Sequence, residues 1–289
     1  MKLISWNLAG RLRHIPQQAK MLSSREPDLV ALQEVRRPGL PLLRKLLHNS
    51  GLIHQVDSFE LATCHALLTG SRCYGLLIAS RFPLSAWESG RFHVPWPERI
   101  LSVDIETPWH PLEMHTTHIP PGVTNGWIKI QMLEGLYAGL ALPSTRPRVL
   151  CGDFNAPQLE WPTGEVVTWG QHINRKGMAV IRKHMRGGEG LRWDQGERQI
   201  LQGLAAYDLS DVFRRLHGYA MQAYSWYPIR MDPHRQARLM GRRFDHGFAS
   251  ASLRPVSCLY LHACRESGLS DHAALRIVFR PELGLARSL

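Results

Sequence analysis

The sequence predicts an α/β protein with a two-layer sheet core, flanked by helices, in a single domain spanning residues 1–289. Short apolar segments with the length of strands recur through both halves of the chain, and helical segments lie between some of them. No linker, internal repeat or shift in composition divides the chain. Because a sheet buries its faces and a helix buries one stripe, this pattern favours packed sheets with helices outside them.

The N-terminal half carries strand patterns separated by helices or tight turns. Residues 100–105 alternate apolar and polar side chains, as a half-exposed strand does. Pro27 ends the first helical segment, and Pro120-Pro121-Gly122 is a strong stop after the last of these strands. We expect helices at 16–25 and 40–47, and strands at 2–6, 28–33, 74–80, 100–105 and 112–119.

The C-terminal half begins with a helical pattern that ends before Pro143 and leads into a buried apolar run. Residues 157–195 form the least regular part of the chain, and they are basic from Arg175 to Arg192. We expect helices at 128–142 and 197–216, and strands at 149–151, 224–226, 244–249, 256–262 and 273–279.

The charge of the chain indicates an anionic partner. Hydrophobic residues make up 44% of the sequence and charged residues 20%, as in globular proteins. The formal net charge of +11 favours nucleic acid or an anionic membrane surface. Basic residues gather in two connecting segments, where they form either a solvated face or contacts to phosphates: Arg175, Lys176, Arg182, Lys183, Arg186 and Arg192, then Arg230, Arg235, Arg238, Arg242 and Arg243.

Hydropathy and cysteine usage indicate a soluble cytoplasmic protein. Residues 1–7 lack the apolar core of a signal peptide, and no apolar run reaches the length of a membrane span. The five cysteines show no Cys-x-x-Cys spacing, and the runs around Cys64 and Cys151 predict buried free thiols. We expect no membrane partner and, because no obligate protein partner is evident, a monomer.

The segment 149–157 carries the most informative local pattern. A buried strand ends at Gly152, and Asp153 and Asn155 follow it. In an extended segment these two side chains point to the same side, so a carboxylate and a carboxamide would face one pocket. The carboxylate can accept a proton or bind a metal, and the carboxamide can donate to an oxyanion. Taken alone, Asp-x-Asn after a strand is more often a turn that satisfies its own backbone.

Polar residues that could serve a reaction recur at the ends of successive predicted strands. Each is weak evidence alone, since a Glu after a strand is often solvated and an Asp-His pair is often a surface turn. Their recurrence at one end of several strands is the stronger observation. The set comprises Asn7, Glu34, His118, Asp153, Asn155, Asp245, Asp271 and His272.

Five short motifs resemble, in order and approximate spacing, those of the endonuclease/exonuclease/phosphatase superfamily. The resemblance runs from about residue 1 to about residue 280. It implies a four-layered α/β sandwich of two packed mixed β-sheets flanked by helices. The motifs are Ser5-Trp6-Asn7, Leu32-Gln33-Glu34, Gly152-Asp153-Phe154-Asn155, Arg243-Phe244-Asp245 and Ser270-Asp271-His272.

The resemblance also implies a metal site and a base. Glu34 is expected to be the main Mg²⁺ ligand, with Asn7 and Asp271 on or near the ion, and Mn²⁺ suits the same hard oxygen ligands. Asp153 is expected to position and deprotonate the attacking water. Asn155 is expected to donate a hydrogen bond to a non-bridging phosphate oxygen.

The remaining implied roles concern charge on the phosphate and the leaving group. His272, oriented by Asp245, is expected to stabilise charge in the transition state. His118 is a candidate general acid, because imidazole titrates near neutral pH. Arg99 is either a phosphate clamp or a surface ion-pair partner.

Within the superfamily, the C-terminal half resembles exonuclease III and the AP endonucleases. The resemblance is carried by Gly196-Glu197-Arg198-Gln199, Leu209-Ser210-Asp211-Val212-Phe213-Arg214 and Tyr224-Ser225-Trp226. It implies Mg²⁺-dependent hydrolysis of DNA, by incision at abasic sites or as a 3′–5′ exonuclease. Substrate contacts are expected from Trp226 and Phe244 as pocket walls and from Arg242 and Arg243. A bulky aromatic or apolar residue is usual in that branch where this chain has Arg242.

One departure keeps another branch open. Exonuclease III and the AP endonucleases have tyrosine where this chain has His118, and histidine there resembles DNase I and tyrosyl-DNA phosphodiesterases. A non-specific DNase-like enzyme, or a phosphodiesterase acting on RNA or tyrosyl-DNA, is therefore the alternative. A catalytically inactive binding module is disfavoured, since Glu34, Asp153 and His272 are all present.

Overall fold

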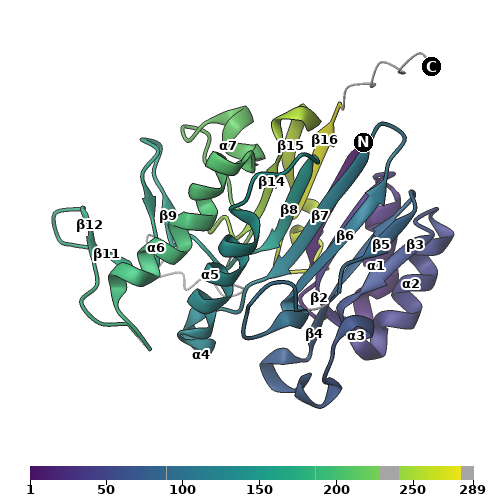
Figure 1. Ribbon diagram of the computed structural model, residues 1–289, viewed down its shortest axis with the longest axis horizontal. Coiled ribbons are helices and arrows are strands. Elements are labelled where there is room, and N and C mark those ends of the chain that lie inside the picture. The colour runs from purple at the N-terminus through teal and green to yellow at the C-terminus, as the bar shows by residue number, and fades with distance from the viewer. Residues whose placement is uncertain (89, 186, 228–240, 281–289) are drawn as a thin grey trace.

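Two six-stranded mixed sheets pack face to face and carry helices on their outer faces (Figure 1). The computed structural model describes the chain except residues 89, 186, 228–240 and 281–289. The predicted α/β sandwich is therefore confirmed.

The first sheet has the strand order β15-β16-β1-β2-β4-β3. β1 and β2 run parallel, and the other neighbours run antiparallel. Its strands are β1 (Lys2–Asn7), β2 (Leu29–Arg36), β3 (His54–Asp57), β4 (Tyr74–Ser80), β15 (Pro255–Leu261) and β16 (Ala274–Phe279).

The second sheet has the strand order β13-β14-β8-β7-β6-β5. β7 and β8 form its parallel pair. Its strands are β5 (Leu84–Ala86), β6 (Ile100–Glu106), β7 (Pro111–His118), β8 (Arg148–Asp153), β13 (Ser210–Asp211) and β14 (Asp245–Ala249). In both sheets the parallel pair is central, which brings the carboxyl ends of β1, β2, β7 and β8 to one edge of the sandwich.

The buried core lies in three layers that follow from strand alternation. Leu3, Ala31 and Ile78 of the first sheet pack between the sheets with Val103 and Met114 of the second. The alternate residues of each sheet pack outward, where helices cover them. The first sheet is covered by α1 (Ile15–Ser23) and α2 (Leu40–Asn49), and the second by α5 (Ile128–Leu140) and α6 (Gly190–Leu201).

The smaller elements lie mostly in the connections. Two short hairpins occupy the segment predicted to be least regular, and the second of them projects at the left edge of Figure 1. They are formed by β9 (Leu159–Glu160) with β10 (Val166–Val167) and by β11 (Gln171–Ile173) with β12 (Ala179–Ile181). The remaining short helices are α3 (Ser58–Leu61), α4 (Gly122–Asn125), α7 (Val212–His217) and α8 (Ala263–Glu266).

Two sequence predictions of secondary structure are wrong. The helix expected at 197–216 ends at Leu201, because the chain then turns through a 3₁₀ segment to Asp208 at φ +58° and pairs β13 with β14. The strand expected at 224–226 is reduced to Trp226, which forms isolated bridges to Arg242 and His272.

The thiol prediction is correct only in part. All five cysteines are free, but Cys64 is exposed and Cys73 is half-buried. Burial raises the pKa of Cys151 to about 12, so this thiol is not a nucleophile. No helix in the described part of the chain has the length and apolar character needed to cross a membrane.

A glycine is required where β8 meets β7. Gly152 adopts φ +140°, and a Cβ atom there would lie 2.0 Å from the backbone oxygen of Thr117 on the neighbouring strand. A side chain would therefore push the two strands apart. The absence of a side chain at Gly152 allows Asp153, the next residue, to reach the edge of the sheet beside His118, its register partner.

A buried ionic network ties the hairpin of β9 and β10 to the second sheet. The Glu160 carboxylate accepts hydrogen bonds from Arg243 at 2.7 Å and from Arg214 at 2.7 and 3.1 Å, and Arg243 also donates to Asp211 at 2.8 Å. Burial would raise the pKa of Glu160, but the charge and hydrogen bonds of Arg243 and Arg214 outweigh it and lower the pKa to about 2. Arg243, predicted to contact substrate, is instead committed to this network.

We expect Glu160 to make stability depend on acid pH. Because its pKa is lower in the folded state, its contribution is complete above the ordinary value of about 4.5 and is lost as the pH falls towards about 2. The shift corresponds to about 3 kcal/mol. In Glu160→Gln, thermal unfolding should occur at lower temperature at neutral pH and should change less between about pH 5 and pH 2 than in the wild type. An equally steep acid dependence in the variant would contradict this assignment.

Candidate active site

A cavity of about 890 Å³ opens at the edge where the carboxyl ends of the central strands meet. Most of the predicted site residues line it, although they come from distant parts of the chain. Asn7 and Asp245 lie directly behind this lining through hydrogen bonds, whereas Arg243 is buried elsewhere. The predicted residues in the lining are Glu34, Arg99, His118, Asp153, Asn155, Trp226, Arg242, Phe244, Asp271 and His272.

Glu34 is delivered by an irregularity in β2. The pairing of β2 with β4 shifts register between Leu32 and Val35, and Glu34 between them adopts φ +52°. A bulge of this kind re-aims a side chain, and positive φ in a non-glycine residue costs about 1 kcal/mol or more. The carboxylate is turned out of the sheet face and into the cavity. Burial raises the pKa of Glu34, and the hydrogen bond from Asn7 opposes this effect.

Asn7 joins the two carboxylates. Its side-chain amide donates to Glu34 Oε1 at 3.1 Å and to Asp153 Oδ2 at 2.9 Å. The side-chain oxygen of Asn7, Oδ1, accepts from the backbone N–H of Ala9 at 2.8 Å, which fixes the orientation of the side-chain amide. Asn7 therefore faces the predicted metal position with its nitrogen, and its contribution here is to hold two acidic groups together.

Asp153 is fully buried, and its surroundings act on its pKa in opposite directions. Burial raises its pKa to about 7, and the charge of His272 opposes this shift. Its Oδ1 accepts from the backbone N–H of Asn155 at 2.9 Å. Asn155 adopts φ +49°, and its side-chain nitrogen lies 2.9 Å from the carbonyl of Ile119 and 3.5 Å from Asp153 Oδ2. A carboxyl group with a pKa near neutrality is suited to accept a proton from water.

His272, which lines the cavity, forms a buried ion pair with Asp245 behind it. His272 Nδ1 lies 2.7 Å from Asp245 Oδ2, and His272 Nε2 lies 3.8 Å from Asp153 Oδ2. Burial lowers the pKa of His272, but the carboxylates of Asp245 and Asp153 outweigh this and raise it to about 10. The imidazole is therefore charged at neutral pH, and it presents an N–H to the cavity.

Arg99 and His118 form a second pair with the opposite result. An Arg99 N–H donates to His118 Nδ1, and because guanidinium has only donors, this nitrogen must be the acceptor. Burial and the charge of Arg99 hold the pKa of His118 well below its usual range. His118 is thus neutral with its proton on Nε2, which lies 3.5 Å from Glu34 Oε1. His118 is therefore not the neutral-pH general acid expected from the sequence, and its geometry favours a hydrogen-bond donor.

The acidic residues at the cavity floor could hold a divalent cation. Ligand atoms of Glu34, His118 and Asp153 all lie within 4.8 Å of one another. Since Nε2 of His118 carries a proton, the two carboxylates are the available ligands. This donor set fits Mg²⁺, which binds through one or two carboxylates and completes its shell with water and substrate phosphate.

Asp271 and the aromatic wall lie at the rim of the same cavity. Asp271 Oδ2 accepts from Trp226 Nε1 at 3.2 Å, so this predicted metal ligand is engaged by the wall. The rings of Trp226 and Phe244 stack with their centroids 5.4 Å apart. Both aromatic residues, predicted to form the walls of a substrate pocket, line this cavity.

The sequence reasoning missed the support beneath Asn155. The buried Lys129 ammonium lies 2.5 Å from Glu197 Oε1 and donates to the Asn155 carbonyl at 2.9 Å. Trp169 Nε1 donates to the same carbonyl at 3.0 Å. Lys129 could have been found, because it shares a helix face with Leu133, Leu136 and Leu140 in a pattern where an apolar residue is expected.

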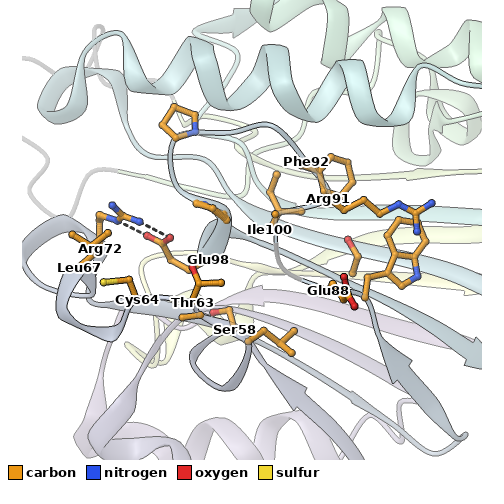
Figure 2. A pocket seen from close by; sticks show the side chains of 17 residues that line it. Ser58, Thr63, Cys64, Leu67, Arg72, Glu88, Arg91, Phe92, Glu98 and Ile100 are labelled. Atoms are coloured by element: carbon orange, nitrogen blue, oxygen red, sulfur yellow. Dashed lines mark hydrogen bonds and ion pairs between the residues drawn. The ribbon is translucent and has the colours of Figure 1, made fainter.

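Contacts beside a smaller cavity explain how Arg99 is held. It has a volume of about 170 Å³, and Figure 2 shows Arg72 and Glu98 paired along it. Arg72 donates two hydrogen bonds to the Glu98 carboxylate, at 2.5 and 2.7 Å. Their chain neighbours are also in contact, because an Arg99 N–H donates to the Ser71 carbonyl. These two contacts fix both loops, and with them the guanidinium that orients His118.

Comparison with known proteins gives a consistent result. Exodeoxyribonuclease III of Haemophilus influenzae is 27% identical over 263 residues, covering 88% of this chain and 89% of that protein. An AP endonuclease from Archaeoglobus fulgidus superposes with a TM-score of 0.68 at 21% identity, covering 96% of this chain and 99% of that one. A 3′ phosphatase from Neisseria, bound to product DNA hairpin, gives 0.65 at 20% identity, covering 97% and 99%.

The match to a family extends over residues 4–272, which includes every residue of the cavity described above. The prediction of a hydrolytic enzyme of the nuclease and phosphodiesterase class is thereby confirmed. The chain belongs to the Endonuclease/Exonuclease/phosphatase family.

Proposed function

We propose that this protein hydrolyses phosphodiester bonds of DNA, with Mg²⁺ as its cofactor and Mn²⁺ able to replace it. The observation that supports this most is the placement of two carboxylates, Glu34 and Asp153, bridged by Asn7 and facing a charged His272. This arrangement offers a cation site on one side of a phosphate and a fixed positive charge on the other. We further propose that residues 1–289 act as one domain and as a monomer in the cytoplasm.

The chemistry follows from the charge states of these groups. Glu34 would be the main ligand of the cation. Asp153, with its pKa near neutrality, accepts a proton from a water molecule that attacks phosphorus in line with the leaving oxygen. The charged His272 and the N–H groups of His118 and Asn155 donate to phosphate oxygens as negative charge grows there. A bound Mg²⁺ would supply Lewis acidity and neutralise charge in the transition state.

The histidine in place of tyrosine is compatible with this chemistry. A tyrosine hydroxyl and a neutral imidazole N–H are both uncharged hydrogen-bond donors. Arg99 holds His118 in the tautomer that donates. We therefore propose that His118 performs a donor role that does not depend on its protonation near neutral pH.

DNA is the proposed substrate because the chain has an excess of basic residues and because the relatives act on it. The basic segment at 175–192 includes Arg182 in the cavity wall. Three residues of the second basic segment, Arg230, Arg235 and Arg238, lie outside the described residues. Incision at abasic sites is the first candidate, since Trp226 and Phe244 offer an aromatic wall for an extruded sugar.

A broader phosphodiesterase is the second candidate, and Arg242 favours it. This residue lines the cavity where the abasic-site enzymes usually have a bulky aromatic or apolar side chain. A charged wall is less selective for a bare sugar and accommodates intact nucleotides. Intact DNA, RNA ends and tyrosyl-DNA adducts are the substrates of this alternative.

A labelled duplex with one abasic-site analogue, compared with the same duplex intact, tests the proposed function. We expect cleavage with Mg²⁺ and none with EDTA, because the carboxylates alone cannot neutralise the transition state. Asp153→Asn should lower turnover by about 10²-fold or more, since it removes the base at nearly constant volume. Incision confined to the lesion favours the first candidate, and equal cleavage of both duplexes the second. Full activity in EDTA, or in a folded Asp153→Asn variant, would contradict the mechanism.

The role of Arg99 can be read from the tautomer of His118. In protein with ¹⁵N-labelled histidine, NMR should place the His118 proton on Nε2 over the range from about pH 6 to pH 8. In Arg99→Met, the tautomer preference should weaken and kcat should fall about tenfold or more with a smaller change in KM. Arg99→Lys keeps a charge and a donor and is the matched control. A proton found on Nδ1 in the wild type would refute the assignment.

A further inference from the structure

Three arginines line the active-site cavity, and the charge of one of them, Arg99, is opposed by Glu34 and Glu98. The other two have no acidic partner among the residues that the structure describes. Arg182 and Arg242 both contribute to the lining of the cavity of about 890 Å³. Within the part of the chain that the structure describes, neither forms an ion pair with a carboxylate. Burial lowers the pKa of Arg242, and no charged neighbour among the described residues offsets it. A desolvated charge without a counter-ion is costly unless an anion arrives.

Neighbouring arginines differ in this respect. Arg243, the next residue along the chain, pairs with Glu160 and Asp211. Arg198 on α6 pairs with Asp194 at 2.9 Å. Among the described residues, Arg198 and Arg243 are thus compensated internally, whereas Arg182 and Arg242 in the cavity wall are not. The uncompensated charge is therefore a local feature of the cavity wall and not a general result of a basic chain.

Neutral groups hold the two guanidiniums in place. Arg182 Nε donates to the Gln171 carbonyl at 2.9 Å, and an Arg242 N–H donates to the Gln158 carbonyl. The Arg242 guanidinium also lies over the Trp169 ring, 5.5 Å from its centroid. These contacts orient both side chains without neutralising either charge, so donors remain for a ligand.

The position of this wall relative to the proposed reaction is set by two links. Trp169 Nε1 donates to the carbonyl of Asn155, beside the proposed base. Trp226 forms bridges to Arg242 on one side and to His272 on the other. Because neighbouring paired segments lie about 5 Å apart, the backbones of Arg242 and His272 are about 10 Å apart. The backbones of Arg242 and His272 are thus separated by Trp226, so their side chains enter the cavity from different positions along its wall.

We propose that Arg182 and Arg242, with the Trp169 ring, form a second phosphate subsite that binds the phosphate adjacent to the scissile one. The inference rests on the proposed function and specifies its substrate: a strand bearing at least one phosphate beyond the bond that is hydrolysed. The adjacent phosphate is either internucleotide or terminal, and guanidinium recognises both in the same way.

Steady-state kinetics on two kinds of substrate test the subsite. Bis(p-nitrophenyl) phosphate has one phosphate, whereas an oligonucleotide has neighbours on both sides of the cleaved bond. In Arg242→Gln and in Arg182→Gln, KM for the oligonucleotide should rise about tenfold or more, with kcat changed less. Both parameters for the small diester should change much less than KM for the oligonucleotide. Arg146→Gln, at an exposed arginine paired with Asp104, removes the same charge elsewhere and should change neither KM nor kcat for either substrate.

Removing the charge from the substrate gives the converse test. A neutral methylphosphonate at the linkage next to the cleaved bond should raise KM for the wild type, and Arg242→Gln should then add no further loss. A dinucleotide with and without a terminal phosphate distinguishes the two sources of the adjacent phosphate. If the terminal phosphate lowers KM to the value for a longer strand, the subsite binds a terminal phosphate. If only a longer strand lowers KM, the subsite binds an internucleotide phosphate.

Several results would overturn the subsite. An equal loss on the small diester and on the oligonucleotide would mean that the arginines only support the fold. An unchanged KM for the oligonucleotide in both arginine variants would mean that they bind no phosphate. A wild type that hydrolyses neither substrate with Mg²⁺ would refute the proposed function itself, and the subsite with it. Hydrolysis of the small diester separates these two failures.

Discussion

The side chain of Asn7 is the contact on which the site depends, because it connects the two sheets at the point where their acidic residues meet. Asn7 ends β1 of the first sheet and donates to Glu34 on its parallel neighbour β2 and to Asp153 on β8 of the second sheet. Two carboxylates this close repel each other and disfavour ionisation. A neutral donor between them offsets part of that cost and leaves their outer lone pairs directed to the cavity.

The surrounding structure fixes Asn7 itself. Its backbone carbonyl accepts from Ser270 Oγ at 2.6 Å, and its neighbour Trp6 donates to the His272 carbonyl at 3.1 Å. The end of β1 and the segment just before β16 are thereby held together, although almost the whole chain separates them in sequence. This explains why a short motif at the N-terminus and another near the C-terminus serve a single cavity.

The sequence was sufficient to predict the longer strands of both sheets and the polar residues at their ends, but not the short strands β3, β5 and β13 or the orientation of the polar side chains. The apolar runs that predict β2 and β8 are local signals, and the polar residues that follow them are visible in the same windows. The bulge and the positive φ that turn Glu34 into the cavity depend on the pairing of β2 with β4, which no local pattern records. The contact of Arg99 with His118 joins the 3₁₀ segment before β6 to the end of β7 and is equally invisible in a single sequence.

The basic composition was informative about the partner but misleading about single residues. Arg243 stands in a basic run, yet it is buried against Glu160 and Asp211, and its charge serves the fold. Arg242, one residue earlier, faces the cavity. Strand alternation sends adjacent residues to opposite faces, so one of two neighbouring arginines can be structural while the other meets the substrate.

Calorimetric titration of Mn²⁺ into the wild type and into Asn7→Ala tests the central claim most directly. If Asn7 holds Glu34 and Asp153 at the spacing that a cation requires, the variant should bind Mn²⁺ at least about tenfold more weakly while its circular dichroism spectrum stays that of a folded protein. An unchanged Mn²⁺ affinity in a folded Asn7→Ala variant would contradict the claim, because the carboxylates would then keep their positions without the bridge.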